Sequence, residues 1–253
     1  SPGQFARARS SAAPARRSRE DGMLVCFWSP KGGSGTSTVA AVAALVSARA
    51  EPTRLVDLAG DQPALLGLAS DPPTGAAEWL AAGAGASADA LDRIALDVHR
   101  DLTLVPRGAG DPRAADPEAG AALGVSLRDD ARPTVADAGH LDADALDALA
   151  AVADASVVVV RGCYLALRRA VRHPATARAA GVVLLEESGR ALGAKEVADV
   201  VGLPLLASIP VRASISRVVD AGVLAARMPD GLTRPMERAL ERLGLRDRRG
   251  RAA

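Results

Sequence analysis

A glycine-rich loop near the beginning of the chain constrains its fold more than any other stretch. The loop spans residues 29–38 and reads Ser-Pro-Lys-Gly-Gly-Ser-Gly-Thr-Ser-Thr, between an apolar run at 24–28 and an Ala/Val-rich run at 39–49. Glycines let the backbone curl so that successive N–H groups point inward, and the following helix adds the dipole of its N-terminus. A strand, a glycine loop and a helix in this order predict a phosphate-binding loop within an α/β fold.

The loop departs from the usual phosphate-loop sequence at one position. That sequence ends Gly-Lys-Ser/Thr, whereas this loop ends Gly35-Thr36-Ser37, so the lysine that reaches the β- and γ-phosphates is missing. Another lysine stands early in the loop, at Lys31, and the chain has only one more lysine against 29 arginines. We predict that Ser37 holds Mg²⁺ and that the nucleotide is bound by Lys31, Gly32, Gly33, Ser34, Gly35, Thr36, Ser37 and Thr38.

Composition argues against several other kinds of protein. Aromatic residues make up only 2% of the chain, too few for the stacking platforms that bind single-stranded nucleic acid. No apolar stretch approaches the roughly 18 residues that a membrane span needs. Residues 1–22 carry a charge of +3 and residues 238–253 carry +4, which leaves −6 for the body between them. An acidic body with basic ends argues against a dedicated DNA-binding surface.

The chain divides into three predicted segments. Residues 1–22 are rich in Ser, Ala, Pro and Arg and predict a disordered basic linker, residues 23–245 predict one α/β domain, and residues 246–253 form a basic tail. Two cysteines, Cys26 and Cys163, fall in or beside predicted strands, and we expect core thiols rather than a disulfide or metal site.

Strands and helices alternate through the predicted domain. This alternation predicts a three-layer, doubly wound, mostly parallel sheet of about seven strands with helices on both faces, whose ligand binds at the carboxyl ends of the strands. We expect helices within residues 70–97 and loose structure over 108–131. The predicted strands are 24–29, 53–58, 102–106, 133–137, 156–161, 181–186 and 204–209, and the other predicted helices are 37–49, 142–153, 164–173 and 194–201.

The Lys-Gly-Gly-x-Gly loop marks the deviant Walker A proteins, and it resembles the loops of MinD and ParA proteins. The resemblance covers most of residues 23–245 and implies a MinD-like P-loop NTPase that takes ATP and Mg²⁺ as cofactors. It implies a homodimer in which Lys31 reaches the partner's nucleotide. The strand that ends at Asp137 resembles the Walker B strand, whose aspartate binds Mg²⁺ through water. Ile209-Pro210 resembles the step that closes the adenine pocket in that family.

Several ligand contacts of the family are missing here. The second strand of the family ends Asp-x-Asp, and this chain has Asp57 at the first position but Ala59 at the second, where a methyl group cannot orient water. Asp61 follows two residues later, and it could either replace the carboxylate or cap the next helix. The family's adenine-reading asparagine has no counterpart, because the sequence contains no asparagine. Arg161 falls at the ligand edge and could supply positive charge or form a structural ion pair.

Further segments resemble one branch of the family. This branch is the CpaE/TadZ-like proteins, and more narrowly the septum-site-determining CpaE-like proteins that are encoded near type IV pilus (Tad) secretion genes. The segments that look like this branch are the glycine loop and residues 57–61, 187–192 and 219–224. The resemblance implies an upstream receiver-like domain missing from this chain. It also implies a cytoplasmic protein, peripheral at the inner membrane or cell pole, that positions pilus, secretion or division machinery. With its altered site, we expect weak or absent ATP hydrolysis, with Lys31, Asp57 and Asp61 as the candidate catalytic residues.

Two other functions remain open from the sequence. One is a working ATPase in which Lys31, Arg161 or Arg190 supplies the missing charge, and the other is a ParA-like DNA-partition module. An apolar stripe near the end of the chain could contact a membrane surface or pack on the domain's own sheet, and packing is the expectation. The stripe consists of Leu232, Met236, Ala239, Leu240 and Leu243.

Overall fold

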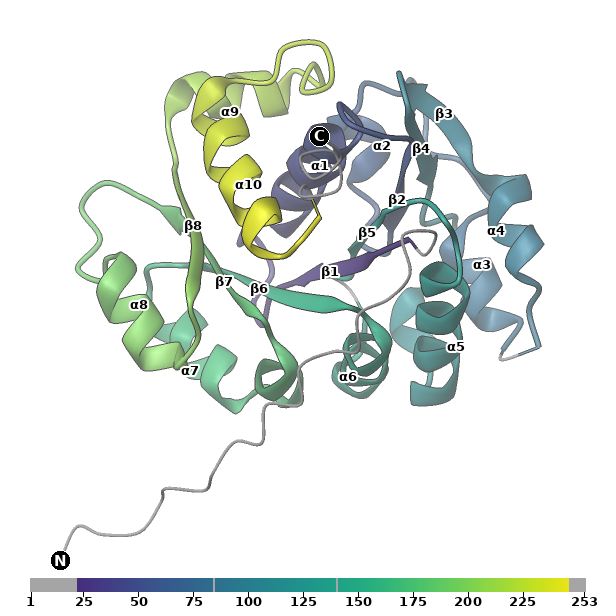
Figure 1. Ribbon diagram of the computed structural model, residues 1–253, viewed down its shortest axis with the longest axis horizontal. Coiled ribbons are helices and arrows are strands. Elements are labelled where there is room, and N and C mark those ends of the chain that lie inside the picture. The colour runs from purple at the N-terminus through teal and green to yellow at the C-terminus, as the bar shows by residue number, and fades with distance from the viewer. Residues whose placement is uncertain (1–21, 84, 140, 246–253) are drawn as a thin grey trace, which may run out of the picture.

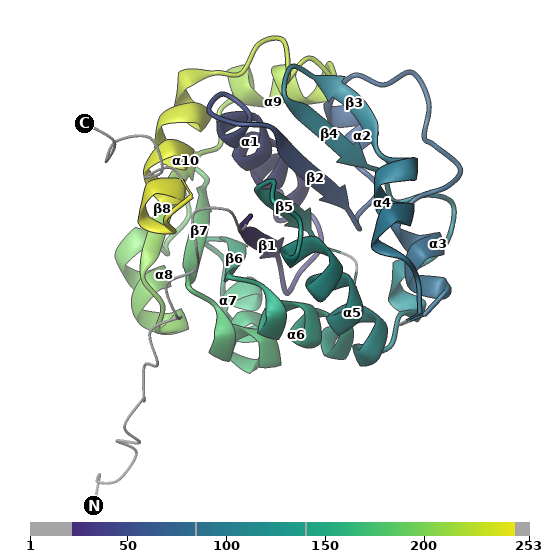
Figure 2. The ribbon, with the colours of Figure 1, turned by 45° about the vertical axis from the view of Figure 1, so that its right-hand side comes forward.

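A computed structural model describes residues 22–83, 85–139 and 141–245, so the predicted linker (apart from Gly22) and the predicted basic tail lie outside the described residues. One eight-stranded sheet carries helices on both of its faces (Figures 1 and 2), which confirms the predicted three-layer, doubly wound, mostly parallel fold. No helix in the described ranges is both long enough and apolar enough to cross a bilayer.

The strands follow the order β3-β4-β2-β5-β1-β6-β7-β8 across the sheet. All neighbouring strands run parallel except β3, which pairs antiparallel with β4 at the edge. The strands are β1 (Leu24–Trp28), β2 (Thr53–Asp57), β3 (Leu96–His99), β4 (Leu102–Val105), β5 (Thr134–Asp137), β6 (Ala155–Arg161), β7 (Gly181–Glu186) and β8 (Leu205–Pro210).

The prediction of about seven strands missed β3. Its residues, Leu-Asp-Val-His, are mostly exposed. An edge strand pairs on one side only and needs no continuous apolar run, so it gives none of the signal that marked the other seven.

Each face of the sheet buries its own core. Side chains alternate along β1, so Val25 and Phe27 join one core while Leu24, Cys26 and Trp28 join the other. The first core packs against α1 (Thr36–Ser47), α2 (Gln62–Leu65), α9 (Ala213–Asp220) and α10 (Asp230–Arg242). The second packs against α3 (Ala76–Ala81), α4 (Ala88–Ile94), α5 (Pro117–Arg128), α6 (Ala143–Val152), α7 (Tyr164–Arg172), the short 3₁₀ helix at 174–178 and α8 (Ala194–Val201). Cys26 and Cys163 are free thiols; Cys26 is a buried core thiol as expected, whereas Cys163 is half-buried.

Residues 108–131 are not loosely structured, and that prediction was wrong. They contain the 12-residue helix α5, whose first turn is capped by the Asp116 carboxylate accepting from Ala119 N at 2.7 Å. Two glycines of α5 lie where this helix packs on α6. A Cβ at Gly120 would stand 2.4 Å from the carbonyl oxygen of Ala145, and one at Gly124 would stand 2.9 Å from Val152 Cβ. These glycines allow close helix packing.

The apolar stripe near the C-terminus packs inside the domain. Leu232, Met236, Ala239 and Leu240 on α10 are buried in the first core, and Leu243 packs partly buried against it. Figure 1 shows α10 beside α1 and β8. The expectation that this stripe covers the domain's own sheet is confirmed, and this face of α10 is not free to contact a membrane.

Candidate phosphate-binding site

The loop between β1 and α1 turns at two glycines in the left-handed region. Gly33 and Gly35 have φ of 74° and 84°, in the left-handed region that side chains rarely adopt. Gly35 also allows a close approach, because a Cβ there would stand 2.3 Å from Leu185 Cδ1. The hydroxyls of Ser29 and Ser34 both donate to the carbonyl oxygen of Lys31, at 2.9 and 2.7 Å, and thereby brace the loop.

A cleft of about 470 Å³ opens over this loop, a size within the range of small-molecule sites. It lies where the carboxyl ends of β1, β5 and β6 meet, as expected for a sheet of this type. Every loop residue from Lys31 to Thr38 lines it, so the predicted nucleotide contacts lie together, with the exception of Pro210. That residue ends β8 opposite Glu186 and is not among the lining residues. The other lining residues are Ser29, Ala59, Asp61, Ala64, Leu65, Gly139, Arg161, Val219 and Asp220.

Asp57 anchors the segment after β2 instead of lining the cleft. Its carboxylate accepts backbone N–H bonds from Ala59, Gly60 and Gln62 at 2.9, 2.6 and 3.1 Å. Burial raises the pKa of Asp57 and these three bonds act in the opposite direction. Asp57 was predicted as a catalytic residue, and the structure gives its side chain the geometry of a positioning residue.

Asp137 ends β5 beside Asp57 and is fully buried. Burial, followed by the neighbouring Asp57 charge, raises the pKa of Asp137 to about 7, against bonds from Gln62, Ser37 and Gly139 that favour the ionised form. The Gln62 amide donates to the Asp137 carboxylate at 2.9 Å and to the Ser37 carbonyl oxygen at 3.0 Å. One buried side chain therefore connects the Walker B-like strand to the first turn of α1.

Sequence reasoning missed Gln62. Gln62 lies outside the glycine loop and outside the Walker B-like strand, and its contact with Asp137 joins positions 75 residues apart. One signal was available, because Gln62 is one of only two glutamines in the chain.

Asp61 directs its carboxylate toward α1. It occupies the position before α2, yet its side chain makes no capping hydrogen bond, so the expected alternative of a helix cap is not observed. Its Oδ2 instead accepts from the Ser37 hydroxyl at 3.1 Å. Asp61 thus lies in the cleft next to the residue predicted to hold Mg²⁺.

The positive side chains near the cleft differ in how free they are. Arg161 lines the cleft, but Glu187 holds it at 2.5 Å and also binds Arg190 at 2.5 Å. These arginines lower the pKa of Glu187, Arg190 foremost. Within the described residues the Lys31 ammonium has no hydrogen bond or ion pair. Arg161 and Arg190 therefore both form ion pairs with Glu187, and for Arg161 this is one of the two expected alternatives. The Lys31 ammonium is available to bind a ligand.

The oxygen atoms at the site suit magnesium as ligands. The Ser37 hydroxyl and the carboxylates of Asp61 and Asp137 are hard oxygen ligands, which Mg²⁺ prefers together with water and phosphate oxygens. The described part of the chain has no group of three or more His, Cys, Asp or Glu residues that could hold a metal ion.

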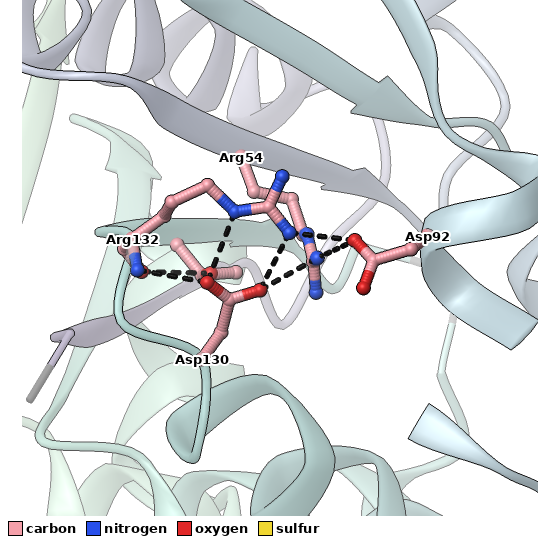
Figure 3. Close-up of polar contacts among 5 residues, drawn as sticks. Arg54, Asp92, Asp130 and Arg132 are labelled. Atoms are coloured by element: carbon pink, nitrogen blue, oxygen red, sulfur yellow. Dashed lines mark hydrogen bonds and ion pairs between the residues drawn. The ribbon is translucent and has the colours of Figure 1, made fainter. Parts of the chain in front are cut away.

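A second charged cluster lies at the opposite, amino-terminal edge of the sheet. Arg54 of β2 is 2% exposed and pairs with Asp92 and, at 2.6 Å, with Asp130, while Arg132 pairs with the same two carboxylates at 2.6 and 2.7 Å (Figure 3). The four side chains tie β2 to α4 and to the segment before β5. Their mutual pairing indicates a structural cluster, separate from the cleft.

Searches against family models and curated proteins gave no match. Solved structures do match. The cell division ATPase MinD of Pyrococcus furiosus aligns with a TM-score of 0.70 and 22% identity, over 88% of this chain and 98% of that one. The septum site-determining protein MinD of Pyrococcus horikoshii OT3, complexed with Mg-ADP, gives 0.68 and 20% over 87% and 95%. A ParA family ATPase of Chlorobium tepidum TLS gives 0.69 and 18% over 87% and 98%. The chain therefore has the MinD/ParA P-loop NTPase fold, and its structural neighbours are MinD/ParA-family ATPases.

Proposed function

We propose that this chain is a MinD/ParA-like spatial-positioning protein that binds ATP with Mg²⁺ in the cleft and hydrolyses it weakly or not at all. One observation carries the proposal: the glycine loop lines a cleft together with two positions, Thr36 and Ala59, whose side chains we expect not to assist hydrolysis. Thr36 lines the cleft where the loop lysine of other P-loop proteins would stand, and Ala59 lines it where the family has a carboxylate. The match to a MinD structure that holds Mg-ADP supports the choice of ligand.

The chain's own groups divide the work of binding. The N–H groups over residues 32–38 and the N-terminus of α1 receive the phosphates. Ser37 and Asp137 hold Mg²⁺, Asp137 through water, and the cation neutralises charge on the phosphates. Removal of one transition-state donor commonly costs roughly 10²–10³ in rate, so two such losses leave little hydrolysis.

A titration tests the proposal. ATP with Mg²⁺ is added to the protein, and binding heat and phosphate release are followed in parallel. We expect saturable binding with little turnover. Turnover comparable to that of an ordinary MinD-like enzyme would contradict the degenerate-site part, and absence of binding would contradict the whole proposal.

A working ATPase remains a second candidate because Asp61 lies in the cleft, 3.1 Å from the Ser37 hydroxyl. Its carboxylate could replace the one lost at Ala59. The commitment of Arg161 to Glu187 weighs against this candidate, since the missing positive charge would have to come from Lys31. The same titration decides between the two.

We further propose that Lys31 acts across a homodimer interface, as the resemblance implies. The free ammonium beside the cleft supports this role. The matched variants are Lys31→Ala and Lys195→Ala, because Lys195 is the only other lysine and lies in α8, away from the cleft. Sedimentation with ATP and Mg²⁺ should show a dimer for wild type and Lys195→Ala, and a monomer for Lys31→Ala. A dimer in all three would refute the role.

The cellular role we propose follows the CpaE/TadZ-like resemblance: placement of pilus, secretion or division machinery from the cytoplasm, at the inner membrane or a cell pole. Among the structural neighbours is a MinC:MinD cell division protein complex of Aquifex aeolicus. A fluorescent fusion expressed in the source cell tests the role. Polar or septal foci that disperse in the Lys31→Ala variant would support it, whereas uniform fluorescence would contradict it.

A further inference from the structure

The position of Asp61 calls for an explanation beyond local structure. The residue precedes α2 without capping it, and its exposed carboxylate points at the first turn of α1. Asp57 already satisfies the backbone N–H groups of this segment, so Asp61 has no part in holding the turn. Its Oδ2 accepts a hydrogen bond from the Ser37 hydroxyl.

The spacing of these two oxygens matches adjacent ligands of one magnesium ion. Mg²⁺ binds six oxygens at about 2.0–2.1 Å in an octahedron, so neighbouring ligands lie about 2.9 Å apart. Ser37 Oγ and Asp61 Oδ2 are 3.1 Å apart. A cation could therefore bind both oxygens once the Ser37 hydroxyl, which keeps its proton, rotates its O–H bond away from Asp61.

The charges around the cleft also favour a bound cation. Asp61, Asp220 and Lys31 line the cleft, while Arg161 is already paired with Glu187 and Thr36 contributes no charge. A polyphosphate that enters this cleft therefore meets two carboxylates and one unpaired ammonium. Since like charges repel strongly where water is partly excluded, phosphate binding here depends on a divalent cation more than in a cleft with a loop lysine.

We propose that Asp61 is a direct ligand of the divalent cation that accompanies the nucleotide. It would restore, two residues further along the chain, the carboxylate that Ala59 lacks, as a metal ligand rather than as a water-orienting group. This inference rests on the proposed nucleotide binding. Gln62, the next residue, would hold Asp137 and the Ser37 backbone in register for the same ion.

Calorimetric titration with ADP, once with Mg²⁺ and once with EDTA, tests the proposal on the whole chain. The variants are Asp61→Asn, which keeps shape and loses charge, and Asp61→Glu, which keeps the carboxylate. Asp71→Asn is the control, because Asp71 is an exposed aspartate ten residues on that does not line the cleft.

The effect of Asp61→Asn on ADP affinity should differ between the titration with Mg²⁺ and the titration with EDTA. With Mg²⁺, Asp61→Asn should weaken ADP binding at least about tenfold, since even indirect metal partners typically contribute 10–100-fold. With EDTA, the same variant should bind ADP as well as wild type or better, because a repelling carboxylate is gone. Asp61→Glu should lose less than Asp61→Asn, and Asp71→Asn should match wild type.

Three results would overturn the inference. Wild-type affinity of Asp61→Asn in Mg²⁺ would show that the carboxylate does not touch the cation. Equal weakening in Mg²⁺ and EDTA would show a structural role. If wild type itself fails to bind ADP in both conditions, the proposed nucleotide binding fails, and the inference fails with it.

Discussion

The buried carboxylate of Asp137 should make the stability of this protein fall as the pH rises. Its pKa in the folded chain is about 7, against a usual value of 3.8 in an unfolded one. Between these values the folded protein binds more protons than the unfolded chain, so the free energy of unfolding decreases with increasing pH. The stabilising effect of the protonated form is complete below about pH 4 and is lost as the pH rises through 7.

The size of the effect follows from the pKa difference. A difference of about three, at about 1.4 kcal/mol for each pKa unit, corresponds to about 4 kcal/mol between pH 4 and pH 8. Asp57 lies beside Asp137 and its pKa is also raised, so the two carboxylates titrate as a pair and the figure belongs to both.

Urea unfolding of wild type and Asp137→Asn, in EDTA at pH 5 and pH 8, measures this dependence. Every other titratable side chain is present in both proteins, so the difference between their pH dependences reports on Asp137 and its coupling to Asp57. We expect wild type to lose about 2.5–3 kcal/mol relative to the variant from pH 5 to pH 8, because part of the effect already lies below pH 5. Parallel slopes, or a wild type that gains stability, would refute the idea that this carboxylate is held in a costly buried position.

Three further substitutions test the surrounding structure. Gln62→Leu removes the amide that donates to the Asp137 carboxylate, and urea unfolding should show a loss of about 1.5–3 kcal/mol at pH 8 and less at pH 5; an equal loss at both would contradict the contact. Arg54→Met leaves Asp130 without its buried partner and should cost about 3 kcal/mol while ADP affinity stays unchanged; altered affinity would mean that this cluster communicates with the cleft. Gly35→Ala should abolish ADP binding, because Gly35 has a left-handed φ and a Cβ there would clash with Leu185. Gly32→Ala, whose Cβ would meet open space, is the control for stability. Retained ADP binding by Gly35→Ala would argue against the loop assignment.

Much of the fold could be predicted because buried parallel strands are apolar on both faces. The run Val157 to Val160, for example, identifies β6 without any knowledge of its neighbours. The two wrong predictions, for β3 and for α5, have a common cause, because each element depends on the neighbouring element that it packs or pairs with. The polar edge strand β3 forms against β4, and the glycines of α5 serve contact with α6.

The candidate site could be predicted where one short segment contains the whole signal. The glycine loop is such a segment, and its residues line one cleft as expected. Contacts across the sheet could not be predicted. Gln62 reaches Asp137 only because β2 and β5 are neighbours, and the direction of the Asp61 side chain follows from how Asp57 binds the turn before it.

The most direct test of the central claim measures binding and hydrolysis in one sample. ATP with Mg²⁺ is titrated into wild type and into the double variant Thr36→Lys/Ala59→Asp, which restores the two missing side chains. We predict saturable ATP binding by both proteins, with phosphate release from wild type slower by on the order of 10²-fold or more. Equal release from the two proteins at saturating ATP would contradict it.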